Sequence, residues 1–252
     1  MVYESIKDFL SRNKTLDNVN YCCCNIGSIE FAHNLILSAK NTNFPITFFA
    51  LDKDSSDYMS NYCDVVNYYT GCKFKLPITK NIDSEYCEWS TQSFNYINWC
   101  AWEIALEILN KGKSLIKLDT DIIVKRNFEL ELIDSLNADN FDFLFQEGGD
   151  GLCAGFSTIH FKSFEKLKNI FSHKTLKKYD YENIPDQRIL RSMVKDKTIN
   201  VKLLSNEKYP NGNYYYNNHV KLDTMCNIIH FNCVVGKHNK ISQFKKFGYW
   251  YL

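Results

Sequence analysis

Two acidic triplets are the residues of this chain whose types and spacing best suit the binding of a metal ion. They are Asp52-Lys53-Asp54 and Asp119-Thr120-Asp121, and each follows an apolar run. Neighbouring carboxylates suit a hard divalent cation that keeps open positions for phosphate oxygens. Asp-x-Asp is short enough to arise by chance, however, and aspartates also cap helices and begin turns. The flanking sequence must therefore distinguish a cation site from a local structural role.

The second triplet has the flanking sequence of a cation site. Leu118 precedes it and Ile122-Ile123-Val124 follows, so we expect its carboxylates to emerge from buried backbone. No basic residue stands between its two acids, whereas Lys53 partly cancels the charge of the first triplet. We therefore expect Asp119 and Asp121 to bind a divalent cation, and one acid of the first triplet to contact a nucleotide.

Strand-like apolar runs alternate with helical patterns along the chain, and these elements must position the acids. The predicted strands are residues 19–24, 45–51, 63–69, 114–118 and 155–161. The predicted helices are residues 29–39, one capped within 55–57, then 94–109, 164–171 and 186–194, and residues 70–91 are predicted to form a loop. This alternation predicts an α/β fold with a mostly parallel sheet covered by helices on both faces, whose ligands bind at the carboxyl ends of the strands. Asn25, Asp52 and Asp119 follow such ends.

Composition limits the class of protein. The 252 residues are 45% hydrophobic and carry a formal net charge of +1, with 30 basic and 29 acidic side chains. This apolar content supports a substantial core and excludes general disorder. The charge balance gives no reason to expect nucleic acid or an anionic membrane as a partner. No linker or low-complexity tract divides the chain, so we expect one domain over residues 1–252.

Cysteine usage and the apolar runs bear on the cellular compartment. The ten cysteines form no Cys-x-x-Cys pair, and several lie within apolar runs, where a free cysteine behaves as a small hydrophobic residue. No run approaches the roughly 20 apolar residues of a membrane span, and residues 1–10 have no signal-peptide core. We therefore expect a reduced, cytoplasmic protein.

Six further landmarks follow one another in a recognisable order. They are Phe49-Ala50-Leu51-Asp52, Asp119-Thr120-Asp121, Leu152-Cys153-Ala154-Gly155-Phe156, Asp186-Gln187, Tyr209-Pro210-Asn211-Gly212 and the segment 229–237, Ile-His-Phe-Asn-Cys-Val-Val-Gly-Lys. In this order the chain, from about residue 18 to 250, resembles the nucleotide-diphospho-sugar transferases of the GT-A type. It is most similar to their retaining branch, which includes glycogenin-like and plant xylosyltransferase-like enzymes. The resemblance implies a single Rossmann-like GT-A domain, with a nucleotide-binding half at about 1–125 and a sugar and acceptor half at about 126–252.

The resemblance also implies a ligand set and an activity. Asp119, Asp121 and His230 would hold Mn²⁺, or Mg²⁺, against the diphosphate of a nucleotide-sugar donor. The resemblance implies a UDP-sugar as this donor, because family members commonly use UDP. The residues that would contact this donor are Asn25, Leu51, Asp52, Thr120, Ala154, Gly155, Gly236, Lys237 and Lys240. Asp186 and Gln187 would lie beside the anomeric carbon, where Asp186 binds the sugar and stabilises charge. The implied function is a retaining glycosyltransferase that moves a hexose or pentose to a hydroxyl group of a glycan, glycoprotein or small-molecule acceptor.

Late aromatic residues and one glycine loop are candidates for contact with an acceptor. Tyr214, Tyr215, Tyr216 and Trp250 could stack on an acceptor sugar, although packing within the protein is the commoner role of such side chains. The loop 148–151 contains three glycines and could shape the acceptor entrance, or simply form a turn.

Departures from the family pattern leave other functions open. Cys153-Ala154-Gly155 stands where members often have Asn-x-Gly, and the helix before the triplet reads Trp99-Cys100-Ala101-Trp102, where many carry a basic residue. A catalytically decayed nucleotide-sugar-binding protein is therefore one alternative. An aspartyl phosphatase of the haloacid-dehalogenase kind is another, although that class places its acidic loop at its first strand. The absence of an anchor in this sequence differs from Golgi relatives and favours a bacterial-type or viral enzyme.

Overall fold

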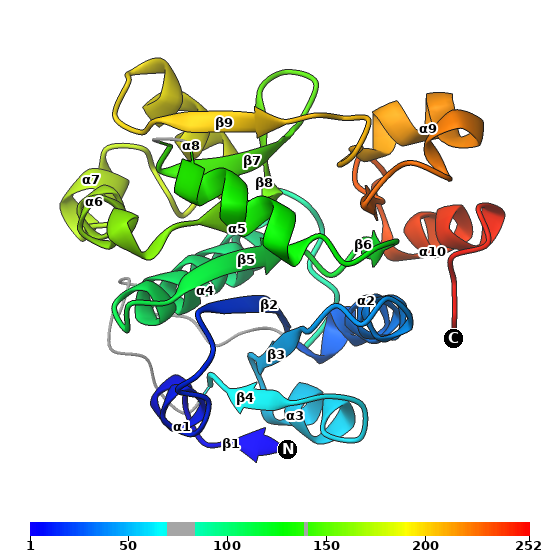
Figure 1. The fold of residues 1–252 in the computed structure, drawn as a ribbon, viewed down its shortest axis with the longest axis horizontal. Helices are drawn as coiled ribbons and strands as arrows, with labels where there is room; N and C mark the ends of the chain where they lie inside the picture. The colour runs from blue at the N-terminus through cyan, green and yellow to red at the C-terminus, as the bar shows by residue number, and fades with distance from the viewer. Residues whose placement is uncertain (70–83, 139–140) are drawn as a thin grey trace.

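An eight-stranded sheet runs through the residues that the computed structural model describes, which are 1–69, 84–138 and 141–252 (Figure 1). Its strands lie in the order β1-β4-β3-β2-β5-β8-β7-β9. Their bounds are β1 (Val2–Tyr3), β2 (Asn18–Cys24), β3 (Thr47–Ala50), β4 (Val65–Asn67), β5 (Ser114–Leu118), β7 (Phe143–Glu147), β8 (Leu152–Ile159) and β9 (Val201–Leu204). A separate two-stranded ladder joins β6 (Ile122–Val124) to β10 (Ile228–His230).

The sheet is parallel over most of its width. Each neighbouring pair from β1 through β4, β3 and β2 to β5 is parallel, and so is the pair of β7 and β9. Only β8, among the described strands of this sheet, runs antiparallel to both of its neighbours, β5 and β7. The predicted α/β class with a mostly parallel sheet is confirmed.

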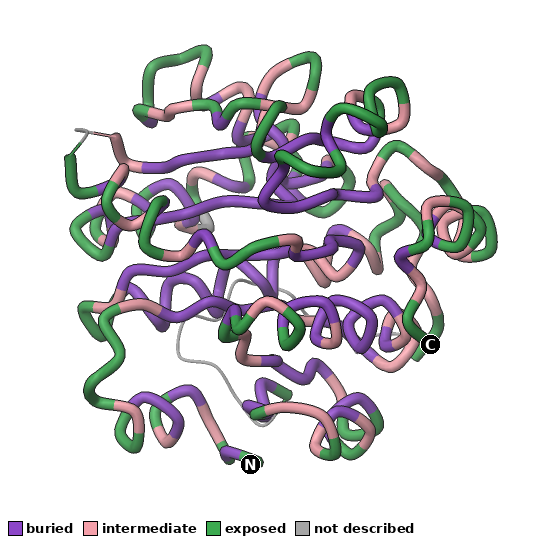
Figure 2. The backbone as a smooth tube through the Cα atoms, turned by 45° about the vertical axis from the view of Figure 1, so that its right-hand side comes forward, coloured by how far each residue is buried: buried purple, intermediate pink, exposed green. Residues whose placement is uncertain are grey.

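Helices cover both faces of the sheet, as the sequence predicts. Apolar side chains of one face pack on α1 (Ile6–Arg12), α4 (Gln92–Leu109), α6 (Phe164–Ile170), α7 (His173–Lys177) and α8 (Asp186–Lys195). Those of the other face pack on α2 (Ile29–Asn41), α3 (Lys53–Met59) and α5 (Glu129–Ala138). Two short 3₁₀ turns, η1 (Ile26–Ser28) and η2 (Phe161–Ser163), precede α2 and α6. Figure 2 shows buried backbone concentrated in the strands and in the helix faces turned toward them.

Local signals set the ends of the helices that frame the site. Thr91 caps α4 by accepting the Phe94 N–H over 3.2 Å, and Gly112, with φ +72°, turns the chain into β5. The cap of α3 is Asp52, whose side chain accepts from the Ser55 N–H at 2.7 Å, so the predicted cap within 55–57 is wrong. Within the predicted loop, residues 84–91 form neither helix nor strand, and residues 70–83 lie outside the described residues.

A third cluster of apolar side chains holds the C-terminal region against the sheet layers. It joins Phe31 of α2 to α9 (Gly212–Leu222), β10 and α10 (Lys237–Lys246). Phe231 and Phe244 stack at its centre, with ring centroids 4.1 Å apart. Tyr215 is buried in this cluster, and Trp250 packs beside Phe31. Both aromatic side chains therefore serve packing.

None of the described helices combines the length and the apolar sequence needed to cross a bilayer.

Candidate active site

The second acidic triplet lies in the connection from β5 to β6. The Asp119 N–H donates to the Gly155 carbonyl over 2.7 Å, which fixes the triplet against β8. The antiparallel ladder of β6 and β10 sets His230 opposite Ile122. As a result, one ligand atom from each of Asp119, Asp121 and His230 lies within 4.8 Å of the other two. The fold thus brings the two acids together with a histidine that is distant in the sequence, since 109 positions separate Asp121 from His230.

The ring of His230 is buried in a fixed orientation. Gln146 donates from its side-chain nitrogen to the backbone carbonyls of Tyr209 and Pro210, at 3.1 and 2.9 Å, so its Oε1 is left to accept. His230 Nδ1 lies 2.7 Å from this oxygen and donates to it. Nε2 therefore faces Asp121 Oδ1, at 3.1 Å. A ring nitrogen held in this way by a carbonyl on the opposite side is typical of metal-binding histidines.

Asp121 lies between two cationic groups. Lys240 Nζ donates to its Oδ2 over 2.6 Å, and both side chains are largely buried. Burial opposes ionisation of Asp121, but Lys240 and His230 outweigh it and hold the pKa of Asp121 well below its usual value. Burial likewise disfavours the imidazolium, yet Asp121 raises the pKa of His230 well above its usual value. A divalent cation at Nε2 would replace this proton, so cation binding there is coupled to proton release.

Gly155 of β8 has no side chain, and Asp119 and His230 occupy the space where one would lie. A Cβ atom at this position would lie 2.4 Å from Asp119 Oδ2 and 2.5 Å from His230 Cε1. Real Cβ atoms essentially never approach that closely, so any side chain here would displace both residues. Glycine is therefore required at position 155 because the side chains of Asp119 and His230 approach its backbone closely, and not because of its backbone conformation.

A buried lysine connects the triplet with the predicted catalytic pair. Lys117 Nζ donates to Asp119 Oδ1 and to the Ala154 carbonyl, each at 3.0 Å, and the residue is only 2% exposed. Trp102 Nε1 donates to Asp186 Oδ2 over 2.7 Å. Burial opposes charge on Lys117, but Asp119 and Asp186 outweigh it and raise the pKa of Lys117. Burial raises the pKa of Asp186, against the opposing effect of Lys117.

The first turn of α8 places the predicted catalytic pair beside the backbone of Ala154. Gln187 Oε1 accepts from the Ala154 N–H over 3.1 Å, and the Ala154 carbonyl accepts from Lys117. The backbone of this one residue therefore contacts both side chains. Cys153 Sγ lies 3.8 Å from His230 Nδ1 and accepts from Asn232 Nδ2 at 3.4 Å. The thiol therefore occupies the position between the histidine and the loop that follows β10.

Most of the predicted site residues line one cavity of about 660 Å³. Its volume lies within the range of small-molecule sites. The predicted residues that line it are Asp119, Thr120, Asp121, Ala154, Gly155, Asp186, Gln187, His230, Gly236 and Lys240.

Three predicted nucleotide contacts at the strand ends do not line this cavity. Asn25 is fully buried and donates to the backbone carbonyl of Glu85 over 2.9 Å. Leu51 is 2% exposed and belongs to the core. The Asp52 carboxylate accepts from the N–H groups of Ile26 and the first turn of α3, at 2.9 and 2.7 Å. In this structure these residues shape the loops at the carboxyl ends of β2 and β3.

The two predicted lysines of α10 are placed differently. Lys240 lines the cavity and contacts Asp121. Lys237 forms a 2.6 Å ion pair with Glu30 of α2 and does not line the cavity.

Several residues that hold this site were not predicted from the sequence. Lys117, Trp102 and Gln146 were given no role, although each is buried and bonded to a predicted site residue. A signal was present for Lys117, because a lysine inside the apolar run 114–118 must be buried with a partner.

The donor set at Asp119, Asp121 and His230 fits a divalent cation. Two carboxylates favour Mg²⁺ or Mn²⁺, and the added imidazole favours the softer Mn²⁺ over Mg²⁺ or Ca²⁺. The buried Gln146 contact, which aims Nε2 at the carboxylates, is the observation that distinguishes this arrangement from a chance cluster of acids.

Comparisons with known proteins agree with this geometry. A family model described as nucleotide-diphospho-sugar transferase matches residues 45–244. A UDP-galactose:fucoside alpha-3-galactosyltransferase of Dictyostelium discoideum is 29% identical over 177 residues, which is 59% of this chain and 27% of that protein. The chain thus spans about a quarter of the length of this curated relative.

Two solved structures have the same fold. Mouse xyloside xylosyltransferase 1 has a TM-score of 0.59 at 11% identity, covering 86% of this chain and 98% of that chain. The galactosyltransferase LgtC, in complex with donor and acceptor sugar analogues, has a TM-score of 0.54 at 11% identity, with coverages of 91% and 93%. At such low identity the likeness shows the fold alone.

Proposed function

The chain belongs to the nucleotide-diphospho-sugar transferase family, and we propose that it moves a sugar from a nucleotide-diphosphate donor to a hydroxyl group with retention of anomeric configuration. The observation that carries this proposal is the meeting of Asp119, Asp121 and His230 in one cavity with Asp186 and Gln187.

The roles of the charged side chains follow from their contacts. Asp119, Asp121 and His230 would hold the cation, Mn²⁺ before Mg²⁺. A cation bound there supplies positive charge for the departing diphosphate. Lys240 lines the cavity beside the cation ligands, so its ammonium can pass from Asp121 to a phosphate oxygen. Gly236, with φ +90° and no side chain, allows backbone approach to the same group.

We expect the sugar of the donor to bind beside α8. Asp186 is 4% exposed and held by Trp102, so its carboxylate keeps one orientation toward a sugar hydroxyl. Its negative charge would stabilise the positive charge that develops at the anomeric carbon. Gln187 is fixed by the Ala154 N–H and presents its amide group to the same region. Lys117 opposes the rise in the pKa of Asp186 that burial causes, and it lines the same cavity.

The relative's name supplies the first substrates to test. By that name, the Dictyostelium relative transfers galactose from UDP-galactose to a fucoside. We extend this pair to the present chain as the starting hypothesis, a UDP-galactose donor and a fucosyl acceptor, with UDP-glucose and UDP-xylose as competing donors.

A thermal-shift panel of UDP-sugars with and without Mn²⁺ tests the donor site. A ligand that binds only the folded state raises its melting temperature. We expect Mn²⁺-dependent stabilisation by a UDP-sugar in the wild type and its loss in Asp121→Asn. Asp134→Asn, at an exposed position of α5, is the matched control and should behave as wild type. An unchanged metal response in Asp121→Asn would move the cation site elsewhere.

Turnover separates the transferase from the alternatives. Release of UDP with Mn²⁺ supports transfer or donor hydrolysis, whereas donor binding without release supports the decayed form. Hydrolysis of p-nitrophenyl phosphate would support the aspartyl phosphatase. Against that function, the triplet follows β5 near the middle of the chain rather than the first strand of the sheet.

A further inference from the structure

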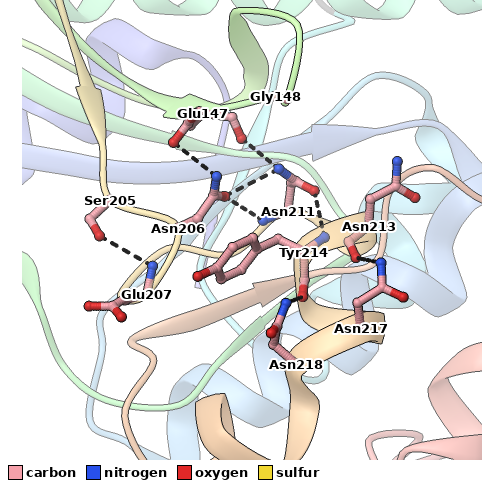
Figure 3. A pocket seen from close by; sticks show the side chains of 11 residues that line it. Glu147, Gly148, Ser205, Asn206, Glu207, Asn211, Asn213, Tyr214, Asn217 and Asn218 are labelled. Carbon is pink, nitrogen blue, oxygen red and sulfur yellow. Dashed lines mark hydrogen bonds between the residues drawn. The ribbon is translucent and has the colours of Figure 1, made fainter.

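A second cavity, of about 550 Å³, opens beside the candidate active site. It lies between the β7–β8 turn, the loop from β9 to α9 and the first turns of α9 (Figure 3). Gly148, Gly149 and Asn213 line both cavities. The two spaces are therefore neighbours, separated by the glycine turn.

The lining of this second cavity is unusually rich in amide groups. We call it the asparagine pocket after its members Asn206, Asn211, Asn213, Asn217 and Asn218. Tyr214 and the carboxylates of Glu147 and Glu207 also line it, and no lysine or arginine does so among the described residues. Lys221 is the partner of Glu207, over 3.0 Å, so its charge is balanced and the lining favours a neutral ligand over a phosphate. Amides donate and accept side by side, which matches the vicinal hydroxyl groups of a neutral sugar.

Part of the asparagine pocket is a rigid network. Asn206 Nδ2 donates to Glu147 Oε2 at 2.9 Å, and Asn211 Nδ2 donates to the Glu147 carbonyl at 2.9 Å and to Asn206 Oδ1 at 3.2 Å. Asn211 also caps α9 by accepting the Tyr214 N–H over 3.1 Å. These bonds join β7 to the start of α9, so the wall of the pocket is formed before any ligand arrives.

Other groups on the same wall remain available to a ligand. Asn217 and Asn218 are exposed and donate to backbone carbonyls of α9, at 2.9 Å each, and their Oδ1 atoms have no partner among the described residues. The Asn213 side-chain amide likewise has no hydrogen bond within the described part of the chain. The half-buried ring of Tyr214 points into the pocket beside Asn206 (Figure 3). A flat ring next to free amides is the usual surface for one face of a sugar.

The turn between the cavities is held from the active-site side. Arg191 of α8 donates to the Leu152 carbonyl at 2.9 Å and pairs with Asp150 at 2.6 Å. Arg191 Nη2 would lie 2.9 Å from a Cβ atom at Gly148, so the turn packs tightly on the arginine. The distance between the two cavities is thereby fixed by the same helix that carries the predicted catalytic pair.

We propose that the asparagine pocket binds a neutral sugar of an extended acceptor glycan, adjacent to the sugar that receives the transferred residue. This inference rests on the proposed glycosyl transfer for its acceptor. It predicts a preference for oligosaccharides over the corresponding monosaccharides, because a monosaccharide can fill the active-site cavity but cannot reach across the glycine turn.

The test uses the full chain on a printed array of neutral mono- and oligosaccharides, in the presence of UDP and Mn²⁺. We expect retention on a subset of oligosaccharides and not on their terminal monosaccharides. Tyr214→Ala and Asn217→Ala should each weaken retention about tenfold, the loss of roughly one good contact. Asn61→Ala is the matched control, because Asn61 is an exposed asparagine that bonds backbone carbonyls of α3, far from the pocket in sequence.

Several outcomes would overturn the proposal. They are the absence of any retention by the wild type, equal retention on mono- and oligosaccharides, and variants that retain glycans as well as Asn61→Ala does. Thermal shift with a UDP-sugar and Mn²⁺ is measured on the same variants, and it should be unchanged because neither residue lines the donor cavity. A wild type that shows this shift but no glycan retention refutes the pocket alone. A wild type that retains oligosaccharides but shows neither donor shift nor UDP release refutes the transferase and leaves a glycan-binding pocket.

Discussion

Substitution of Gly155 by alanine offers the most direct test of the cation site, because it changes the space between two ligands without removing either one. The new Cβ would meet Asp119 Oδ2 at 2.4 Å, whereas ordinary contacts begin at 3.4 Å. Asp119 or the backbone of β8 must therefore shift by about 1 Å, and His230 by a similar amount. Shifts of supporting groups on this scale weaken metal binding by about 10–100-fold.

The expected change in melting temperature can be worked out from this loss. With Mn²⁺ and a UDP-sugar at one hundred times the dissociation constant, binding stabilises the folded wild type by about 2.7 kcal/mol. For a domain of this size that corresponds to about 5–11 °C. A hundredfold weaker affinity leaves about 0.4 kcal/mol, or about 1 °C. Overpacking should also lower the stability of the metal-free variant by about 1–3 kcal/mol.

The assay is therefore the difference between melting temperatures with and without Mn²⁺, rather than the melting temperature alone. Gly112→Ala is the control, because Gly112 has nothing within 4 Å of its Cβ position but adopts φ +72°. Alanine there should cost about 1–2 kcal/mol of stability through backbone strain and leave the Mn²⁺ response intact. If Gly155→Ala keeps the full Mn²⁺ response, the reasoning that places the cation between these side chains is refuted.

Two other substitutions test the charges of the fold. Lys117→Met removes a buried ammonium from between two carboxylates and should lower the free energy of unfolding in urea with EDTA by about 3–5 kcal/mol. Lys113→Met, at a lysine that bonds a backbone carbonyl, should lower it by less than about 0.5 kcal/mol, and equal losses would contradict the assigned role of Lys117. The pKa of Asp223 is lowered because the Tyr249 hydroxyl and the Lys125 ammonium outweigh burial. Its stabilising contribution is therefore present above about pH 4 and lost as the pH falls through the folded pKa. Asp223→Asn should melt below wild type at pH 7, and this difference should shrink as the pH falls below about 4; a constant difference would argue against ionic stabilisation.

Much of the fold could be predicted because its buried elements have strong, well-ended patterns. The predicted strand 114–118 has the bounds of β5, and α4 begins two residues before the predicted helix. Gly112 marks the boundary between them, since its φ of +72° is one that few other residues adopt. Strand direction was not predictable from these patterns, because the buried run that forms β8 is compatible with either direction.

The C-terminal helices gave weaker signals. α9 is rich in asparagine and tyrosine, which are poor helix formers, and it forms because Asn211 caps it and Tyr215 and Leu222 are buried. α10 buries only Phe244 among its ten residues. Tertiary packing therefore decides these elements, and a local pattern cannot show it.

The candidate site was predictable where residue type carries chemistry and not where it depends on neighbours. The acidic triplet and His230 were identified from their types and from family order, and the fold brings them together. Asp52 has the same type and a similar position after a strand, but its carboxylate caps α3 and holds the Ile26 N–H. Asp119 lies two positions from Lys117, but its other partners, Ala154 and Asp186, come from β8 and α8, so no spacing within the sequence identifies them.

The short ladder between β6 and β10 determines when the proposed cation ligands come together. Residues 122–124 pair with 228–230, so Asp121 and its imidazole partner meet only after a loop of 109 positions has closed. During synthesis on the ribosome, the nascent chain carries the two carboxylates long before residue 230 is added. Until then the acids would hold a divalent ion no better than any exposed pair of aspartates does. If these residues bind a cation as proposed, tight ion capture would report that this ladder has closed, and a chelator added during refolding would act only on molecules in which it has formed.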